Sequence, residues 1–577
     1  MKKKLLPALI VTGLIILVVI IMGITALINK YTPTKKTEDL KEYFNISSDD
    51  EAALIVDNEL SDYKAKIIDK KIYVDYKFVH DSLNSRFYWD ANENVLLYTT
   101  ASDIISAAAD SNSYSVTKQT NDFGYPIVKA TSDSALIALD YVKQYSNITF
   151  KSYDDPARVV ITSKWDEIDS ATVSKSTQVR VKGGIKSPIL KEVKKDDKIT
   201  ILDSGDKWDK VATEDGVIGY IKSKALSESK KTKLTNPDYE EETFTHIKKD
   251  KDICLAWNQV TSQSANSKVP QVISSTKGIN VMSPTWFYLN DNNGNLADIA
   301  SKDYVSYCHS QGIEVWGLFS NFENTDVDAA YVLTHTSTRT TLINQIMSAA
   351  FNYELDGVNI DFENITEAAY GDSYIEFIRE LAIKCHNNGI SLSVDVTVPA
   401  SFNKFFNRSD MANFADYIVI MGYDEHYKGS DAGSVSSIPW VTEGVESTLK
   451  EVPADQIILG MPFYTRIWEL TPKEDDDAVT DTEDQSKYTV ASQVYSMDAA
   501  AAQLATNNAT AALDEESGQN YAEWSVSNKL YKVWLEDTTS LEKRLKLVDD
   551  NKLAGAAFWK LGFENSSVWD TVIKYLN

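Results

Sequence analysis

Two acids lie two positions apart at the end of an apolar stretch that begins at Asp356 and reads DGVNIDFE. Because side chains alternate along a β-strand, Asn359, Asp361 and Glu363 share one face, and the apolar residues between them share the other. Two carboxylates buried beside each other without a chemical purpose would cost several kcal/mol or force protonation. We therefore expect a catalytic strand rather than a core strand that merely contains acids.

The same segment resembles the signature of glycoside hydrolase family 18, the chitinase-like enzymes, in which three spaced acids precede a glutamate. Asp356, Asp361 and Glu363 match this pattern, whereas Asn359 stands where the family has an acid. The asparagine can donate a hydrogen bond to Asp361, but it cannot share a titrating proton. The substitution therefore leaves the pH optimum open, while the proton donor is intact. The resemblance is greatest to the peptidoglycan and spore-cortex branch of the family.

Apolar strand-like runs alternate with helical stretches over residues 245–577, which we expect to be the catalytic domain. The runs begin at Ile253, Ile279, Ile313, Leu355, Ile390, Asp416, Ile457 and Ala554. Parallel strands with helices between them predict a TIM (β/α)8 barrel with the acidic strand as its fourth strand. The long interval before the last strand predicts an α+β insertion at about residues 466–545, with a helix in SQVYSMDAAAAQLAT and strands from Tyr521 to Trp534.

Other strand ends carry further candidate site residues, because reactive groups of a TIM barrel lie at the carboxyl ends of its strands. Tyr423 and Asp424 end the sixth strand in MGYDEH, and Trp559 lies in the eighth. Family 18 has a Met-x-Tyr-Asp and a tryptophan at these places, so the resemblance extends over about 330 residues of this chain. It implies that Asp356 and Asn359 also belong to the substrate-binding set.

The resemblance implies a substrate-assisted, retaining mechanism, in which the 2-acetamido oxygen of the sugar is the nucleophile. Glu363 would protonate the leaving oxygen and later activate water. Asp361 would orient the acetamide and stabilise the positive charge. Tyr423 would hydrogen-bond the attacking carbonyl, Asp424 would hold the acetamido group, and Trp559 would form the floor of the sugar site. No metal or organic cofactor is required by this chemistry.

Several aromatic residues have two possible roles, in a sugar groove or in a core. On the barrel strands they are Trp257, Trp286, Trp316 and Phe319, and in the insertion they are Tyr488 and Trp524. The sequence leaves both roles open for each of them.

The N-terminal segment, residues 1–30, is expected to be an uncleaved membrane anchor. Leu5 to Ile28 carry no charge, Lys2 to Lys4 precede them, and no small-residue cleavage site follows. This length spans a bilayer, which needs about 20 apolar residues. The positive residues predict a single-pass protein with a cytoplasmic N-terminus and the bulk of the chain extracellular.

Two modules are expected between the anchor and the barrel. Residues 43–165 contain an internal similarity between the segments from Ile72 and Ala135, each with a strand, a short helix and a hairpin, and they resemble the amine-oxidase-N-like stalk domain. Residues 170–227 have the short strands of a small β-barrel and resemble bacterial SH3-type domains, which implies binding to the cell wall. Residues 228–244 are polar and are expected to be a linker.

Chain length, net charge and cysteine spacing limit the number of domains and the kinds of partner and site that we expect. The 577 residues predict three or four domains. The net charge of -26 makes nucleic acid an unsuitable partner, because phosphate neutralisation needs a basic face. The dispersed cysteines Cys254, Cys308 and Cys385 have neither metal-ligand spacing nor a disulfide framework, so we expect buried thiols.

Together these features favour a membrane-anchored extracellular glycosidase that hydrolyses β-1,4 bonds in N-acetylglucosamine-containing polymers, with peptidoglycan as the preferred substrate. The same chemistry would serve a chitinase or an endo-N-acetylglucosaminidase on other glycans. A third reading is a non-catalytic cell-wall or carbohydrate-binding protein, whose usual mark is loss of the acid that stands here as Glu363.

Overall fold

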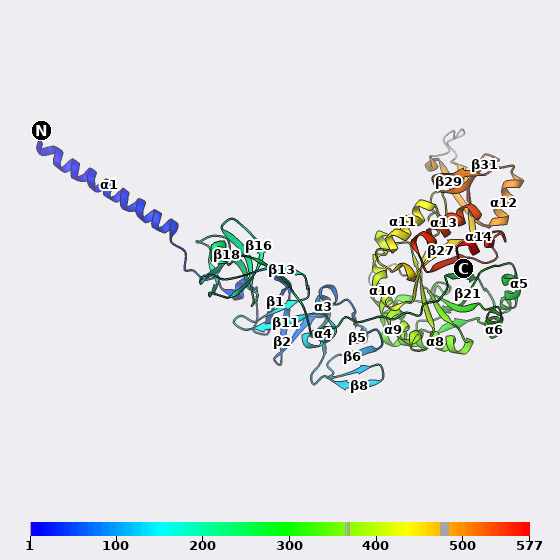
Figure 1. The fold of residues 1–577 in the computed structure, drawn as a ribbon, viewed down its shortest axis with the longest axis horizontal. Coiled ribbons are helices and arrows are strands. Elements are labelled where there is room, and N and C mark those ends of the chain that lie inside the picture. Colours follow the sequence, from blue (N-terminus) through cyan, green and yellow to red (C-terminus); the bar gives the residue numbers. More distant parts are fainter. Residues whose placement is uncertain (1, 364, 366–369, 474–483, 577) are drawn as a thin grey trace. The chain divides into compact units, whose positions relative to one another are not determined.

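The computed structural model describes residues 2–363, 365, 370–473 and 484–576 (Figure 1). The chain divides into two compact units. The first comprises residues 1–89, 107–114 and 121–241, and the second comprises residues 90–106, 115–120 and 242–577.

The first unit begins with one long helix, α1 (Lys2–Tyr31). Its stretch Leu9–Tyr31 has a mean hydropathy of 2.9, and none of it is buried. A helix of this length and composition meets the requirement of about 20 apolar residues for crossing a bilayer. A signal sequence near an N-terminus meets the same requirement, so the helix is a candidate for either.

Two seven-stranded sheets follow α1 in the first unit. The first has the order β11-β12-β1-β2-β3-β10-β9, with strands at Thr149–Tyr153, Arg158–Thr162, Glu51–Val56, Glu59–Ile68, Lys71–Asp75, Ala135–Ala138 and Val128–Ala130. The second has the order β15-β14-β18-β17-β16-β13-β19, with strands at Ile189–Val193, Thr177–Arg180, Ile218–Lys222, Trp208–Thr213, Lys198–Asp203, Glu167–Thr172 and Lys230–Lys233. Val179, Val211 and Ile221 are fully buried in the core of the second sheet because alternate side chains along its strands face inward.

The two internally similar segments have the same order of elements. The segment from Ile72 forms β3, α3 (Tyr76–Ser82), β4 (Phe87–Asp90) and β5 (Val95–Thr99). The segment from Ala135 forms β10, α4 (Leu139–Tyr145), β11 and β12. In both, the last residue of the first strand, Asp75 or Ala138, is also the N-cap of a helix of seven residues.

The second unit contains a closed parallel barrel. Its strands are β20 (Ile253–Asn258), β21 (Val281–Leu289), β23 (Glu314–Ser320), β24 (Gly357–Asp361), β25 (Ser391–Thr397), β26 (Tyr417–Met421), β27 (Ile457–Pro462) and β33 (Gly555–Trp559). β20 pairs in parallel with both β21 and β33, which closes the ring. Every strand expected from the apolar runs is present, so the predicted barrel is confirmed.

Helices surround the barrel (Figure 1). They include α6 (Lys302–Ser310), α8 (Thr336–Tyr353), α9 (Gly371–His386), α10 (Arg408–Phe414), α11 (Ile438–Thr448), α13 (Thr538–Asn551) and α14 (Val568–Tyr575). Outward side chains of the strands, such as Val358 and Ile360, pack against these helices in the main core. A smaller apolar cluster that includes Leu255 and Trp316 fills the inside of the barrel, so the barrel is a packed core rather than a pore.

A second small sheet interrupts the barrel between β27 and β33. Its order is β29-β28-β32-β31-β30, with strands at Tyr488–Ser496, Tyr464–Pro472, Lys529–Leu535, Gln519–Val526 and Ala512–Asp514. The helix expected in SQVYSMDAAAAQLAT starts later than predicted, because Ser496 caps α12 (Met497–Thr506) and the preceding residues belong to β29. Residues 474–483 of the expected insertion lie outside the described residues.

Candidate active site

The fourth strand of the barrel, β24, separates apolar from polar side chains as the sequence predicts. Phe362 is buried and its ring stacks on Phe377 of α9 at 5.5 Å between centroids. Asn359 and Asp361 are buried on the other face, toward the barrel interior. At the start of the strand, a Cβ on Gly357 would lie 2.5 Å from Cδ1 of Trp316, so only glycine allows this close approach.

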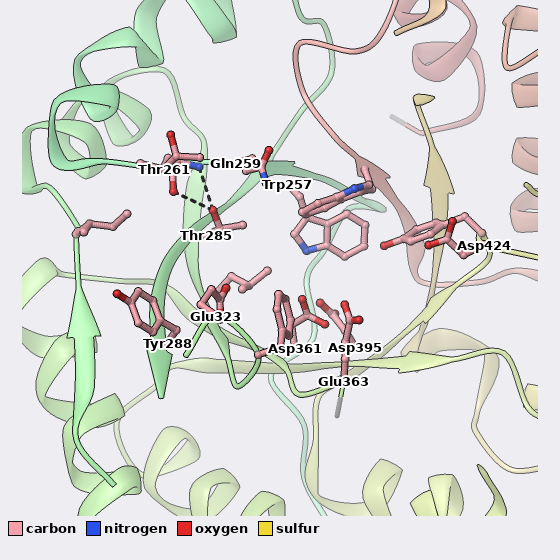
Figure 2. A pocket seen from close by; sticks show the side chains of 16 residues that line it. Trp257, Gln259, Thr261, Thr285, Tyr288, Glu323, Asp361, Glu363, Asp395 and Asp424 are labelled. Carbon is pink, nitrogen blue, oxygen red and sulfur yellow. Dashed lines mark hydrogen bonds between the residues drawn. The ribbon is translucent and has the colours of Figure 1, made fainter. Parts of the chain in front are cut away.

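A cavity of about 550 Å³ opens beyond the carboxyl end of β24. Figure 2 shows the residues that line it. Five of them are acids, namely Glu323, Asp361, Glu363, Asp395 and Asp424, and the lining also includes Trp257, Tyr423 and Trp559. The structure therefore brings together most of the residues that the sequence selected.

Glu363 lies at the mouth of this cavity. Its backbone N–H donates a hydrogen bond of 3.0 Å to Oδ1 of Asn321, which fixes the chain just after β24. The residue is exposed, yet protein atoms displace enough water around its carboxyl group to raise the pKa, and the negative charges of Asp424 and Glu323 raise it further. A carboxyl group that holds its proton at higher pH is suited to act as a general acid.

Asp361 is the buried acid of the pair, with 7% of its surface exposed. Its Oδ1 atom is buried and has no hydrogen-bond partner among the described residues. Burial raises its pKa well above the usual value, and the charges of Asp395, Glu363 and Glu323 add to the rise. The charged form of Asp361 is therefore costly until a ligand or a proton compensates it.

Asn359 joins its own strand, β24, to three other strands of the barrel, β20, β21 and β25. Its Oδ1 atom accepts hydrogen bonds from Nε1 of Trp257 at 3.0 Å and from Oγ of Ser283 at 2.9 Å. Its Nδ2 atom donates to Oδ1 of Asp395 at 2.7 Å and to Oγ of Ser393 at 3.1 Å. Both the oxygen and the NH₂ group of the Asn359 amide are thus hydrogen-bonded within the protein. The NH₂ group donates to Asp395 rather than to Asp361.

Asp424 is anchored by the inserted sheet. The hydroxyl of Tyr464 donates to its Oδ1 atom at 2.5 Å, and Nη2 of Arg466 lies 3.7 Å from the same atom. Asp424 has a φ of 61°, a left-handed conformation that aspartate adopts more readily than most residues and that turns the chain at the end of β26. β28 begins at Tyr464, so the insertion and the barrel meet at this acid.

Aromatic rings form another part of the cavity. The ring of Trp257 lies 6.1 Å from that of Trp559 and 6.5 Å from that of Tyr423, in edge-to-face arrangements. Burial raises the pKa of the Tyr423 hydroxyl well above its usual value, and nearby carboxylates reinforce this, so the group stays a proton donor.

The other aromatic candidates belong to cores. Trp286 donates to Asn266 and is fully buried, Trp316 stacks on Tyr417, and Phe319 stacks on Phe287. In the insertion, Tyr488 packs with Trp468 and Leu470, and Trp524 stacks on Tyr531. None of these five residues is in the cavity lining, whereas Trp257 is.

Asp356 lies away from the cavity. It precedes β24, at the opposite end of the strand from Glu363, and its Oδ2 atom accepts hydrogen bonds from the backbone N–H of Val315 and from Nε2 of His309, both at 2.8 Å. This acid therefore ties the start of β24 to β23 and α6, and it is not in the cavity lining. The signature spacing alone could not separate this position from the reactive end of the strand.

Two acids of the cavity were not selected from the sequence. Asp395 stands inside the apolar run ISLSVDVTV, where an acid on the same face as Ser391 and Ser393 was an available signal. Glu323 follows β23, and its carboxylate accepts from the hydroxyl of Ser320. No comparable pattern marks Glu323 in the sequence.

The three cysteines are free and buried, as expected from their spacing. Burial raises the pKa of Cys254 to about 12, so its thiol is inert at ordinary pH.

Comparison with known proteins agrees with the barrel fold. The family model of glycosyl hydrolases family 18 matches residues 321–564. The chain is 24% identical over 302 residues to the uncharacterized glycosylase YvbX of Bacillus subtilis (strain 168), covering 49% of this chain and 81% of that protein. It is 24% identical over 287 residues to the cortical fragment-lytic enzyme of the same organism, covering 48% of this chain and 63% of that enzyme.

A solved structure supports the fold. The spore cortex-lytic enzyme SleL of Bacillus cereus superposes with a TM-score of 0.50 at 19% identity, covering 57% of this chain and 76% of that one. At this identity the likeness concerns the fold, which is the barrel described above. The family match includes the strand that carries Asp361 and Glu363 and the later strands that carry Tyr423 and Trp559. Residues 321–564 of the chain therefore match the family 18 glycoside hydrolases.

Proposed function

We propose that this protein hydrolyses β-1,4 bonds next to N-acetylglucosamine in a cell-wall polymer, by a retaining mechanism in which the substrate's acetamido oxygen attacks. The observation that carries the proposal is the position of Glu363 and Asp361 at one end of β24, in a cavity that also holds Tyr423, Asp424 and Trp559. Both acids have raised pKa values because burial and neighbouring negative charges oppose ionisation. One exposed and one buried acid match the needs of a proton donor and of a charge stabiliser.

In this mechanism each group has a defined task. Glu363 protonates the leaving oxygen and then removes a proton from the attacking water. Asp361 accepts the acetamide N–H and stabilises the positive charge of the cyclic intermediate. Tyr423 donates its hydroxyl to the acetamide carbonyl, Asp424 holds the acetamido group, and Trp559 offers an apolar face to the sugar ring.

Asn359 and Asp356 have indirect tasks. Asn359 positions its neighbours through its bonds to Trp257 and Asp395. Asp356 stabilises the start of the strand through Val315 and His309. Neither of them lines the cavity, so we assign substrate contact to neither.

Peptidoglycan is the substrate that we favour. Two matched relatives carry the printed names cortical fragment-lytic enzyme and spore cortex-lytic enzyme, which describe those proteins. The chain also has an apolar N-terminal helix, and a membrane anchor would hold the barrel at the cell wall. We further propose that residues 43–165 act as a stalk and that residues 170–227, an SH3-type domain, bind the wall, joined by a linker at 228–244 to the catalytic domain.

The function is tested by comparing the purified wild-type protein with the variant Glu363→Gln. Glutamine has nearly the same shape as glutamic acid but no acidic proton to donate. We expect the variant to lose at least about a hundredfold in kcat on its substrate. Mass spectrometry of the products from peptidoglycan, chitooligosaccharides and glycoproteins identifies the bond that is cut. Equal activity of both proteins, or binding without turnover on all three substrates, contradicts the proposal.

The anchor is tested separately by comparing the full chain with a chain that lacks residues 1–31. We expect the full chain to sediment with membranes and the shortened chain to stay in the supernatant with the same kcat. Release of the full chain after cleavage near Tyr31 would instead identify α1 as a signal sequence.

A further inference from the structure

Asp395 is a second buried carboxylate beside Asp361, and the mechanism above gives it no role. It has 2% of its surface exposed and lies on β25. Ile360 of β24 pairs in parallel register with Val394 of β25, so the next residues along the two strands, Asp361 and Asp395, are cross-strand neighbours. Both side chains line the cavity, and Figure 2 shows them beside Glu363.

A chain of hydrogen bonds determines which group faces Asp395. The indole N–H of Trp257 can only donate, so it fixes the oxygen of the Asn359 amide on its own side. The NH₂ group of Asn359 must then face Asp395, to which it donates at 2.7 Å. This bond stabilises the ionised form of Asp395 relative to that of Asp361, whose Oδ1 atom has no partner among the described residues.

The surroundings of the two acids oppose charging both of them at once. The ionisable groups that face the pair are Glu363 after β24, Glu323 after β23, Tyr423 after β26 and Tyr374 of α9. None of them is a cation, and the cavity lining of the described residues contains no lysine, arginine or histidine. Burial is the main cause that raises the pKa of both Asp361 and Asp395, and the charge of Asp395 further raises that of Asp361.

We propose that Asp361 and Asp395 share one proton, and that Asp395 is the positioning residue that sets the charge of Asp361 during the reaction. In the free enzyme the proton rests on Asp361, because Asn359 stabilises the ionised Asp395. When positive charge develops on the substrate, the O–H bond of Asp361 breaks and an O–H bond forms on Asp395. Asp361 then carries the full negative charge that the intermediate needs, and the pair keeps one proton throughout.

This inference rests on the glycosidase function proposed above and supplies what Asn359 cannot. The side-chain amide of Asn359 does not titrate, so it has no proton to exchange with Asp361, whereas a carboxyl group has one. In this protein the amide of Asn359 orients its neighbours through hydrogen bonds. The carboxyl group of Asp395, on the neighbouring strand, is the group that exchanges a proton with Asp361.

The test compares Asp395→Asn with Ser393→Ala. Ser393→Ala removes an acceptor of the Asn359 amide on β25, whereas Asp395→Asn keeps an amide oxygen that can accept this hydrogen bond and removes the titrating group. For Asp395→Asn we expect kcat to fall at least about tenfold with KM changed by less than about threefold. The alkaline limb of kcat/KM should move to lower pH by about one unit, because a negative charge that faces Glu363 is lost. Ser393→Ala should leave the limb in place.

A measurement without turnover separates this proposal from the proposed function. In a Glu363→Gln background with isotope-labelled aspartate, the infrared band of the protonated carboxyl group reports the shared proton directly. We expect the midpoint for loss of this band to move to lower pH by about one unit when Asp395→Asn is added. Adding Asp549→Asn, at an exposed residue of α13, should leave the midpoint unchanged.

The outcomes are distinct. An unchanged infrared midpoint in Asp395→Asn, or a pH profile identical to that of Ser393→Ala, overturns the shared proton. A shifted midpoint in a protein that cleaves none of the tested glycans supports the shared proton and contradicts the function. If Asp395→Asn fails to fold, Asp361→Asn in the same background is the second variant. The band should then be lost at lower pH, because Asp395 stands alone with its hydrogen bond from Asn359, and an unchanged midpoint overturns the proposal.

Discussion

Nε1 of Trp257 donates a hydrogen bond of 3.0 Å to Oδ1 of Asn359, and this contact fixes the direction of a buried amide at the centre of the barrel. The indole cannot accept a hydrogen bond, so the amide has only one orientation that satisfies both partners. The bond joins the first strand of the barrel to the fourth and, through the Asn359 amide, to Asp395 on the fifth.

Replacing Trp257 by phenylalanine keeps an aromatic ring in the cavity and removes the donor. We expect the variant to lose stability by about 1–3 kcal/mol, because a buried acceptor loses a partner, and to lose kcat as well, because the amide is no longer held in one orientation. Thermal unfolding and steady-state kinetics measure the two effects.

Trp286→Phe is the matched control, since it also removes a buried indole donor, to Asn266, but lies outside the cavity lining. It should destabilise the protein and leave kcat unchanged. Equal loss of kcat in the two variants would show that the Trp257 bond has no special role.

The Tyr464 hydroxyl is expected to hold Asp424 in place for the substrate. Tyr464→Phe removes this hydrogen bond to a carboxylate. We expect kcat/KM to fall about tenfold, which corresponds to about 1.4 kcal/mol, the range of a hydrogen bond to a charged group. Tyr353→Phe removes a similar bond to Asp298, and because neither residue is in the cavity lining it should leave kcat/KM unchanged. Wild-type kinetics in Tyr464→Phe would exclude a positioning role.

Protein stability should depend on pH through Asp361. Its folded-state pKa is raised by burial and by neighbouring charges, so the folded state binds a proton that the unfolded state has released. The stabilisation is complete below the unfolded pKa of about 3.9 and is lost as pH rises through the folded pKa. Asp361→Asn should therefore raise Tm by about 2 °C or more at neutral pH and leave it unchanged at low pH.

Thermal unfolding of the wild type and of Asp361→Asn, from low to neutral pH, measures the difference in Tm. Asp549→Asn, at an exposed residue, is the control. A variant that is less stable than wild type at neutral pH, with the gap closing at low pH, would mean that Asp361 is stabilised as an anion in the folded state.

Gly357 is expected to tolerate no side chain. Alanine would place a Cβ 2.5 Å from Cδ1 of Trp316, a fully buried ring with no space to move. Overpacking of this kind costs about 1–3 kcal/mol. Gly184→Ala is the control, because nothing lies within 4 Å of the added Cβ. Chemical denaturation that finds the two substitutions equal would contradict the close packing at the start of β24.

The sequence by itself determined the barrel and the reactive strand end. Apolar runs alternating with helical stretches located every barrel strand, because each strand is buried on both faces and must be continuous and apolar. The alternation along DGVNIDFE placed Asp361 on the interior face, and strand ends marked Tyr423, Asp424 and Trp559. These are local patterns, and a local pattern is what a sequence shows directly.

Only the tertiary structure decided which of these groups meet. Asp356 has the signature spacing but lies at the other end of the strand from Glu363. The Asn359 amide makes its hydrogen bonds to protein groups, namely Trp257, Ser283, Ser393 and Asp395. Asp395 comes from another strand, because barrel closure and parallel register bring it beside Asp361. Which carboxyl groups raise each other's pKa depends on distances across strands and on burial, and neither quantity is encoded in the spacing along one strand.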